Sequence, residues 1–243
     1  MQNMNILTKR IVPFGNKIYY YALDILFPPI CVSCSVPIKD QRTYLCSDCF
    51  DKITIQTAPT CPACGKRQAG KELCNRTPYT LAASCYYHEP IPQLIQYFKY
   101  KKLENIQTIL SAILIVHAQK IIPHIESYII SYIPLHPKKE QARGFNQSRI
   151  LAQTVANYFQ IPCMQTLQRI RNTPSQTKQK GSLGRYKNIQ DCFSSVDPKN
   201  IQGKNIILVD DVSTSGATLR EATKILRTYH PHHIVGLVIA KVE

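Results

Sequence analysis

The sequence lacks a hydrophobic run long enough to cross a membrane. Its longest purely aliphatic stretch, residues 112–116, falls far short of the ~20 residues that a transmembrane helix needs. It also lacks a cleavable secretory signal, because Lys17 and Asp24 interrupt the apolar stretch that precedes residues 26–29. These two absences favour a cytoplasmic protein.

Acidic residues are missing from a long central stretch. The chain has a formal net charge of +15, yet residues 141–190 contain no aspartate or glutamate. A solvated basic face usually intersperses acids, so this stretch favours a polyanionic partner, either a phosphorylated small molecule or a nucleic acid. Its positive charges, which are the candidate DNA-binding residues, are Arg143, Arg149, Arg169, Arg171, Lys178, Lys180, Arg185 and Lys187.

A buried strand followed by a polar turn stands near the C-terminus. Residues 206–209 are four aliphatic side chains in a row, and the hydroxyl- and glycine-bearing run that follows them cannot extend the strand. Residues 234–240 are apolar again, and a helix lies between, so we predict a strand, loop, helix and parallel return strand. The apolar face of that helix consists of Leu219, Ala222, Leu226 and Tyr229.

The turn has the composition of a phosphate site. Small residues at a helix N-terminus leave backbone amides exposed where the helix dipole is positive, and hydroxyl side chains add donors. Asp210 and Asp211 suit a pair of vicinal hydroxyls or a hydrated Mg²⁺, so together they indicate a ribose 5-phosphate site. The magnesium strand of a nucleotide hydrolase is the alternative, but the chain has no Gly-x4-Gly-Lys-Ser/Thr loop to accompany it. The predicted phosphate-binding residues are Ser213, Thr214, Ser215, Gly216, Ala217 and Thr218.

Two Cys-x2-Cys pairs, separated by eleven residues, predict a structural zinc ion. In a reducing compartment such pairs bind metal more often than they form disulfides. Four thiolates leave no open coordination position, so we expect the zinc to be structural. The predicted ligands are Cys31, Cys34, Cys46 and Cys49.

A second ribbon begins at Cys61 and Cys64 and continues at Cys74, but it lacks a fourth ligand. Thr77 stands where the last cysteine of a closing pair would be. Cys85 or His88 is a possible fourth ligand, although an isolated cysteine is more often a small buried apolar residue. We therefore do not expect this second site to close around zinc.

The rest of the chain alternates helices and a strand. Residues 18–26 have helical spacing and are expected to pack on the body of the protein, the alternative being contact with a membrane surface or a nucleic acid. Residues 91–98 and 106–121 predict amphipathic helices, and residues 128–133 predict a strand closed by a proline-rich turn.

Residues 138–147 are predicted to open a further helix, whose core face is Leu151, Val155 and Tyr158. The polar segment 171–188 has no apolar period. It is predicted to be either a flap over the site or an unstructured linker.

Residues 206–218 resemble the signature of type I phosphoribosyltransferases, enzymes that bind 5-phosphoribosyl 1-pyrophosphate (PRPP). This resemblance implies that residues 213–218 hold the 5-phosphate and that Asp210 and Asp211 address the ribose 2- and 3-hydroxyls, with Mg²⁺ bound alongside PRPP. It also implies an α/β fold with a Rossmann-like parallel sheet.

The whole chain further resembles the ComF family of competence proteins, which join an N-terminal zinc ribbon to a phosphoribosyltransferase-like domain. The matching pieces are residues 26–31, the two cysteine pairs, residues 134–136, residues 143–147, Arg169, Gln176, Arg185, Asn188 and the Asp210 loop. The implied organisation is an N-terminal helix (1–30), a zinc ribbon (31–85) and a phosphoribosyltransferase-like domain (86–243). The resemblance also places Leu135, His136 and Arg143 near the pyrophosphate.

Three functions remain open from the sequence. The family implies a competence protein for natural transformation that handles incoming single-stranded DNA, with PRPP as ligand and a competence helicase or DNA-processing proteins as partners. The alternative is an active phosphoribosyltransferase of nucleotide salvage or synthesis that transfers phosphoribosyl from PRPP to a nitrogenous acceptor. A PRPP loop by itself does not establish such catalysis. The third is a zinc-built interaction adaptor with a vestigial pocket.

Overall fold

A computed structural model describes residues 29–38, 44–62, 79–101, 104–173 and 188–242. The predicted helix at residues 18–26 lies outside this part of the chain. So do Cys64, Cys74 and most of the polar segment 171–188.

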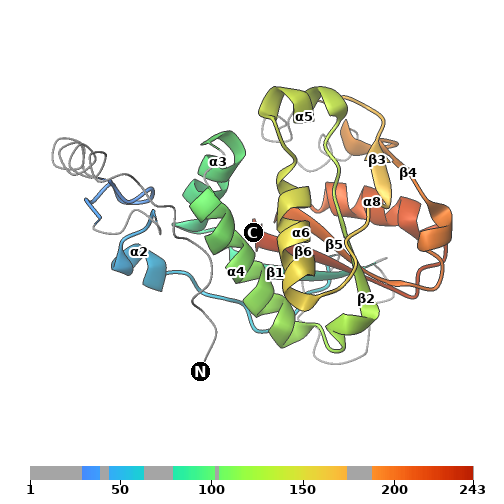
Figure 1. Cartoon of the computed structure of the whole chain (residues 1–243), viewed down its shortest axis with the longest axis horizontal. Helices are drawn as coiled ribbons and strands as arrows, with labels where there is room; N and C mark the ends of the chain where they lie inside the picture. The colour runs from blue at the N-terminus through green and yellow to red at the C-terminus, as the bar shows by residue number, and fades with distance from the viewer. Residues whose placement is uncertain (1–28, 39–43, 63–78, 102–103, 174–187, 243) are drawn as a thin grey trace, which may run out of the picture.

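The fold is built on a four-stranded parallel sheet (Figure 1), in which the strand order is β1-β6-β5-β2. All three pairs of neighbouring strands run parallel. The predicted strands at 128–133, 206–209 and 234–240 are confirmed, and β5 continues past the expected end to include both aspartates. The strands are β1 (Thr80–Tyr86), β2 (Tyr128–Tyr132), β5 (Asn205–Ser213) and β6 (His233–Lys241).

Both faces of the sheet are buried, because successive side chains of a strand point to opposite sides. In β5, the side chains of Ile207 and Val209 belong to the hydrophobic core on one face of the sheet. Those of Ile206 and Leu208 belong to the core on the other face. This explains why the strand is a continuous apolar run and not an alternating one.

Helices α3, α4 and α6 cover one face of the sheet, and α8 covers the other together with a small two-stranded antiparallel sheet. The helices expected at 91–98 and 106–121 are confirmed. The bounds are α2 (Ser47–Asp51), α3 (Ile91–Lys101), α4 (Glu104–Ile121), η1 (Ile125–Ser127), α5 (Pro137–Arg143), α6 (Gln147–Phe159), β3 (Leu167–Arg169), β4 (Phe193–Ser195), η3 (Pro198–Asn200) and α8 (Ala217–Arg227).

The single helix predicted from residue 138 is wrong, because the segment forms two helices. Gly144 has φ of 84° and ends α5, with its N–H donating to the Glu140 carbonyl at 2.7 Å. Asn146 then caps α6 by accepting hydrogen bonds from the N–H groups of Ser148 and Arg149. A left-handed glycine followed by a capping asparagine is a helix stop and start.

The core face predicted for this region needs a second correction. Leu151 and Val155 are buried, but Tyr158 is 56% exposed. Ala152 and Ala156 complete the buried face of α6 instead.

The predicted boundary between residues 85 and 86 falls inside β1, so the parallel sheet starts before that boundary. Residues 55–60, which lie between Cys49 and Cys61, pair antiparallel with the outer edge of β1. The bridges join Ile55 to Cys85 and Thr60 to Leu81. Cys85 is fully buried in this strand, and burial raises the pKa of its thiol to about 12. It therefore fits the packing alternative better than the role of a zinc ligand.

Candidate functional site: a zinc cluster and a pocket at the end of β5

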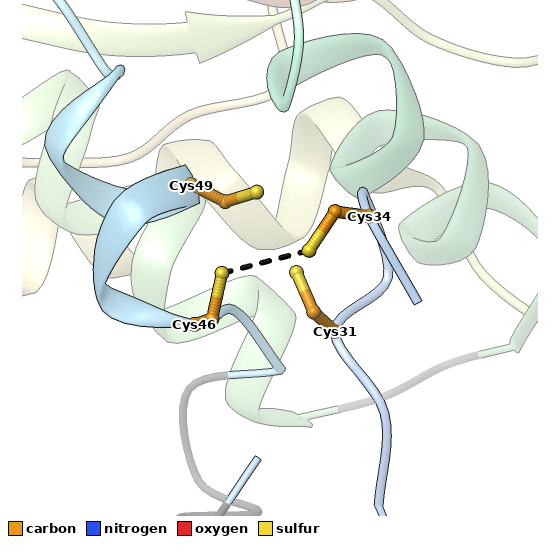
Figure 2. A group of neighbouring side chains, drawn as sticks. All are labelled: Cys31, Cys34, Cys46 and Cys49. Atoms are coloured by element: carbon orange, nitrogen blue, oxygen red, sulfur yellow. Dashed lines mark hydrogen bonds between the residues drawn. The ribbon is translucent and has the colours of Figure 1, made fainter. Parts of the chain in front are cut away.

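Four cysteines of the N-terminal region point toward one centre (Figure 2). The Sγ atoms of Cys31, Cys34, Cys46 and Cys49 all lie within 4.8 Å of one another, and those of Cys34 and Cys46 are 3.6 Å apart. Tetrahedral zinc with Zn–S bonds of about 2.3 Å places its sulfurs about 3.8 Å apart, so the four thiols fit the ion. The structure thus brings together all four predicted ligands.

Local backbone geometry holds each cysteine pair. The first pair sits in a tight turn, in which the Ser35 N–H donates to the Cys31 carbonyl at 2.9 Å. The second pair brackets the start of α2, because Cys46 is the N-cap and Cys49 lies in the first turn. Cys61, from the suggested second group, is buried, whereas its companions Cys64 and Cys74 lie outside the described residues.

A pocket of about 550 Å³ opens where β5 leaves the sheet. Ligands of parallel sheets bind at this carboxyl edge, because the loops there diverge to leave a crevice. The residues lining the pocket are Tyr87, Lys99, Tyr100, Ile133, Leu135, Lys139, Ala142, Arg143, Gln147, Ser148, Arg169, Asp210, Asp211, Val212, Thr214 and Thr218.

The predicted phosphate loop forms one wall of the pocket. Gly216 adopts φ of 73° and is the N-cap of α8, so the backbone reverses there and the helix N-terminus follows. Thr214 and Thr218 line the pocket. The other residues of the loop are not part of the pocket lining: Ser213, Ser215, Gly216 and Ala217. Exposed amides at the start of an eleven-residue helix suit an anion.

The two aspartates lie at the floor of the pocket and have different environments. Asp210 Oδ1 accepts hydrogen bonds from Ser148 Oγ and from the Asp211 N–H, both at 2.9 Å. Asp211 forms an ion pair with Lys99, whose Nζ is 2.7 Å from Asp211 Oδ2. Burial, and then the negative charge of Asp211, raises the pKa of Asp210 to about 7.

Lys99 is the main pocket residue that sequence reasoning missed. It directly follows the amphipathic helix predicted at residues 91–98, and this position gave it no predicted role at the site. Burial by itself would lower the pKa of Lys99, but the charge of Asp211 and their hydrogen bond outweigh it and raise that pKa. The available signal was a lysine followed by an aromatic residue at the end of an amphipathic helix, which does not reveal where the side chain ends in space.

A group of cations lines the same pocket as the aspartates. Arg143 donates through Nη1 to Gln147 Oε1 at 2.6 Å, and its guanidinium lies 5.9 Å from the centre of the Tyr100 ring. Arg169 donates to Thr173 Oγ1 at 2.7 Å. Lys139 was not predicted; burial, together with the charges of Arg169 and Arg143, lowers its pKa.

The other predicted residues have different places. Leu135 lines the pocket, whereas His136 is the N-cap of α5 and its Nδ1 accepts from the Lys138 N–H at 3.3 Å. Among the DNA-binding candidates, Arg149 pairs with Glu140 at 3.4 Å and Arg171 donates to the Gln190 carbonyl at 2.6 Å, both outside the pocket lining. The candidates Lys178, Lys180, Arg185 and Lys187 lie outside the described residues.

Comparison with known proteins matches both parts of the chain. Residues 22–77 match the double zinc ribbon domain, and residues 146–241 match the phosphoribosyl transferase domain. Competence protein ComFC of Bacillus subtilis (strain 168) is 26% identical over 226 residues, which cover 81% of this chain and 88% of that protein. The chain is therefore similar to the ComF family over most of its length.

A second relative is the DNA utilization protein YhgH of Salmonella typhimurium. It is 28% identical over 216 residues, which cover 82% of this chain and 91% of that protein. The solved adenine phosphoribosyltransferase of Leishmania tarentolae is 11% identical, with coverage of 68% of this chain and 77% of that one and a TM-score of 0.39. The matches to the two domains, together with the parallel sheet, show the predicted fold class: α/β, a type I phosphoribosyltransferase domain with a parallel sheet and an N-terminal zinc ribbon. Within the described part, no helix has both the length and the apolar character that crossing a membrane requires.

Proposed function

We propose that this chain is a cytoplasmic competence protein that handles incoming single-stranded DNA and binds PRPP with Mg²⁺. The observation that carries the proposal is the pocket at the end of β5, where a phosphate loop, two carboxylates and a cationic wall meet. The names of the relatives, competence protein and DNA utilization protein, support the cellular role. A competence helicase and DNA-processing proteins are the partners that this role calls for.

PRPP carries two anionic ends, and the pocket offers a complementary wall for each. The 5-phosphate suits the loop that ends at α8, and the pyrophosphate suits Lys139, Arg143 and Arg169 in the same pocket. The carboxylates of Asp210 and Asp211 also line this pocket and are good acceptors for ribose hydroxyls. Their oxygens are also the hard ligands that Mg²⁺ takes, and the ion would neutralise part of the pyrophosphate charge.

Single-stranded DNA needs cations for its phosphates and flat side chains for its bases. The stretch free of acids supplies the first, and Tyr100, 73% exposed at the pocket, supplies the second. Both interactions tolerate any base sequence. A protein that receives DNA of arbitrary sequence requires this tolerance.

Two titrations test the proposal. Calorimetry with PRPP and Mg²⁺ should show one binding site per chain, and filter binding of an oligothymidylate should show affinity that falls steeply as salt rises. The absence of PRPP binding would instead support the adaptor with a vestigial pocket. The absence of DNA binding even at low ionic strength would remove the DNA-handling role.

One observation also favours an active phosphoribosyltransferase. A carboxyl group with a pKa of about 7 inside a ligand pocket suits general acid-base chemistry at neutral pH. This alternative expects pyrophosphate release from PRPP with a base or amine acceptor, and loss of that release when Asp210→Ala and Asp211→Ala are combined. A broad acceptor screen without turnover would count against it.

A further inference from the structure

Two sets of residues that the sequence suggested separately meet in one cavity. Arg143 and Arg169 come from the basic stretch, whereas Asp210, Thr214 and Thr218 come from the sugar-phosphate motif, and all five line the same pocket. The two sets lie far apart in the sequence. Only the packing of α5 and β3 beside the end of β5 brings them together.

The cationic wall of the pocket has unused capacity for an anion. Among the described residues, Lys139, Arg143 and Arg169 form no salt bridge, and the buried Arg169 Nε has no hydrogen-bond partner there. These cations repel one another, and burial deprives them of part of their hydration. A bound phosphate offsets both unfavourable effects, so the group favours phosphate binding.

The other described candidates, Arg149 and Arg171, lie outside the pocket lining. Arg149 is paired with Glu140, and Arg171 donates to a backbone carbonyl without a salt bridge. A DNA phosphate approaching the described part of the basic stretch therefore meets at the pocket a group of three cations that form no salt bridge there. Tyr100, with the Arg143 guanidinium against its ring, provides a stacking surface at the same place.

The pocket has room for one ligand. Its volume of about 550 Å³ lies within the range of roughly 300–1,000 Å³ that is typical of single small-molecule sites. A DNA nucleotide that contacts Lys139, Arg143 and Arg169 would thus occupy the position proposed above for the PRPP pyrophosphate.

We propose that the DNA strand and PRPP share this pocket and exclude each other, so that PRPP releases bound single-stranded DNA. The inference rests on the proposed function, because it needs both ligands to bind. Exclusion is reciprocal: DNA weakens PRPP binding by the same factor by which PRPP weakens DNA binding. The PRPP level would then set how long a strand stays on the protein.

The test is a competition assay with the full chain. Fluorescence polarisation follows a fluorescein-labelled oligothymidylate at low salt with Mg²⁺, first alone and then with increasing PRPP. At a PRPP concentration about ten times its own Kd, we expect the apparent Kd of the oligonucleotide to rise about tenfold, and to keep rising in proportion. Sodium chloride added to the same ionic strength is the control, and it should give a much smaller rise.

A pair of variants checks the assignment to the wall. Arg169→Gln should weaken both ligands by about tenfold while the circular dichroism spectrum stays unchanged. The matched control Lys204→Gln removes one exposed charge at the opposite edge of the sheet, where β5 begins, and should change neither affinity by more than about twofold. Should Arg169→Gln fail to fold, the wild-type competition still decides.

The outcomes separate the two ideas. Binding of both ligands with a DNA affinity that saturating PRPP leaves unchanged means separate sites, and it would overturn the shared pocket while leaving the proposed function intact. Failure of either ligand to bind alone would overturn the proposed function itself.

Discussion

Three charged side chains set the electrostatics of the pocket floor. Lys99 Nζ lies 2.7 Å from Asp211 Oδ2, and the second carboxylate, Asp210, is held close to that of Asp211. Like charges at short range in a low dielectric cannot both ionise easily. Burial and the neighbouring negative charge therefore raise the pKa of Asp210 to about 7, while the positive charge of Lys99 acts in the opposite direction.

Asp210 should make PRPP binding depend on pH. The raised pKa, about 7, means that the acceptor form predominates only above pH 7. Because an ionised carboxylate accepts ribose hydroxyls and attracts Mg²⁺ better than a protonated one, the affinity should rise about tenfold between pH 6 and pH 8. Calorimetry at pH 6, 7 and 8 measures it.

Asp210→Asn is the control, because it keeps an acceptor for Ser148 but cannot titrate. Protonation of PRPP itself affects both proteins alike, so the difference between them reports Asp210. An identical pH profile in wild type and variant would show that this carboxyl does not govern binding.

Lys99→Met should weaken PRPP binding by about tenfold. The variant keeps most of the length of the side chain but leaves Asp211, only 15% exposed, without its counter-charge, so the pocket repels an anion more strongly. Removal of this positive charge should also shift the pH profile of binding upward, because Lys99 helps to hold down the pKa of Asp210.

Lys204→Met is the matched control for the loss of one lysine charge, since Lys204 is exposed where β5 begins. Calorimetry supplies both affinities, and circular dichroism shows whether the fold is kept. Equal affinities for the two variants would exclude a role for Lys99 at the site.

At the scale of elements, the junction between β5 and α8 depends on a left-handed residue. Gly216 has φ of 73°, and a Cβ there would lie 3.4 Å from the Tyr79 hydroxyl. A side chain in this conformation costs about 1–2 kcal/mol, so the loop relaxes and its amides lose their common direction.

Gly216→Ala should therefore lose stability and PRPP affinity together. The strain corresponds to a fall in Tm of about 2–8 °C for a chain of this size, and the affinity should fall at least tenfold. Gly203→Ala is the matched control: its φ is 69°, nothing lies within 4 Å of the new Cβ, and it is remote from the pocket. It should lower Tm similarly while binding PRPP normally, and a parallel loss of binding there would contradict the local explanation.

The break between α5 and α6 shows how one element boundary builds the site. Because α5 ends at Gly144, Arg143 turns back toward Gln147, and the new helix starts with Ser148 beside Asp210. Gln147 Nε2 also reaches the Lys99 carbonyl at 3.5 Å. Three helix ends thus meet at the pocket, which one continuous helix would not allow.

For the molecule as a whole, the zinc ribbon and the sheet share one core. Cys31, Leu45 and Cys49 belong to the same buried cluster as Leu94 and Phe98 of α3, and Figure 1 shows α2 beside α3 and α4. The antiparallel bridges to β1 add a backbone connection. Loss of the ion should therefore affect the entire chain and not only its N-terminal part.

Cys46→Ser should remove the bound zinc and lower the Tm of a single unfolding transition by roughly 5–10 °C, since metal binding contributes directly to folding. Metal analysis and calorimetry measure the two effects. Cys163→Ser is the control, because Cys163 lies outside the cluster and should keep the zinc. Full zinc content in Cys46→Ser, or two separate transitions, would contradict the shared core.

A wild-type content of two ions would assign the second to Cys61, Cys64 and Cys74.

The sequence by itself determined what depends on neighbouring residues. The spacing of Cys31, Cys34, Cys46 and Cys49 predicted the four-cysteine cluster, and the contiguous stretch from residue 206 to residue 218 predicted a strand, a polar turn and a helix start. Only the tertiary structure decided what depends on distant residues. Lys99 reaches Asp211, Arg169 lines the same pocket as Asp210, and β1 joins the sheet, because packing and charge compensation act through space, where spacing along the chain carries no information.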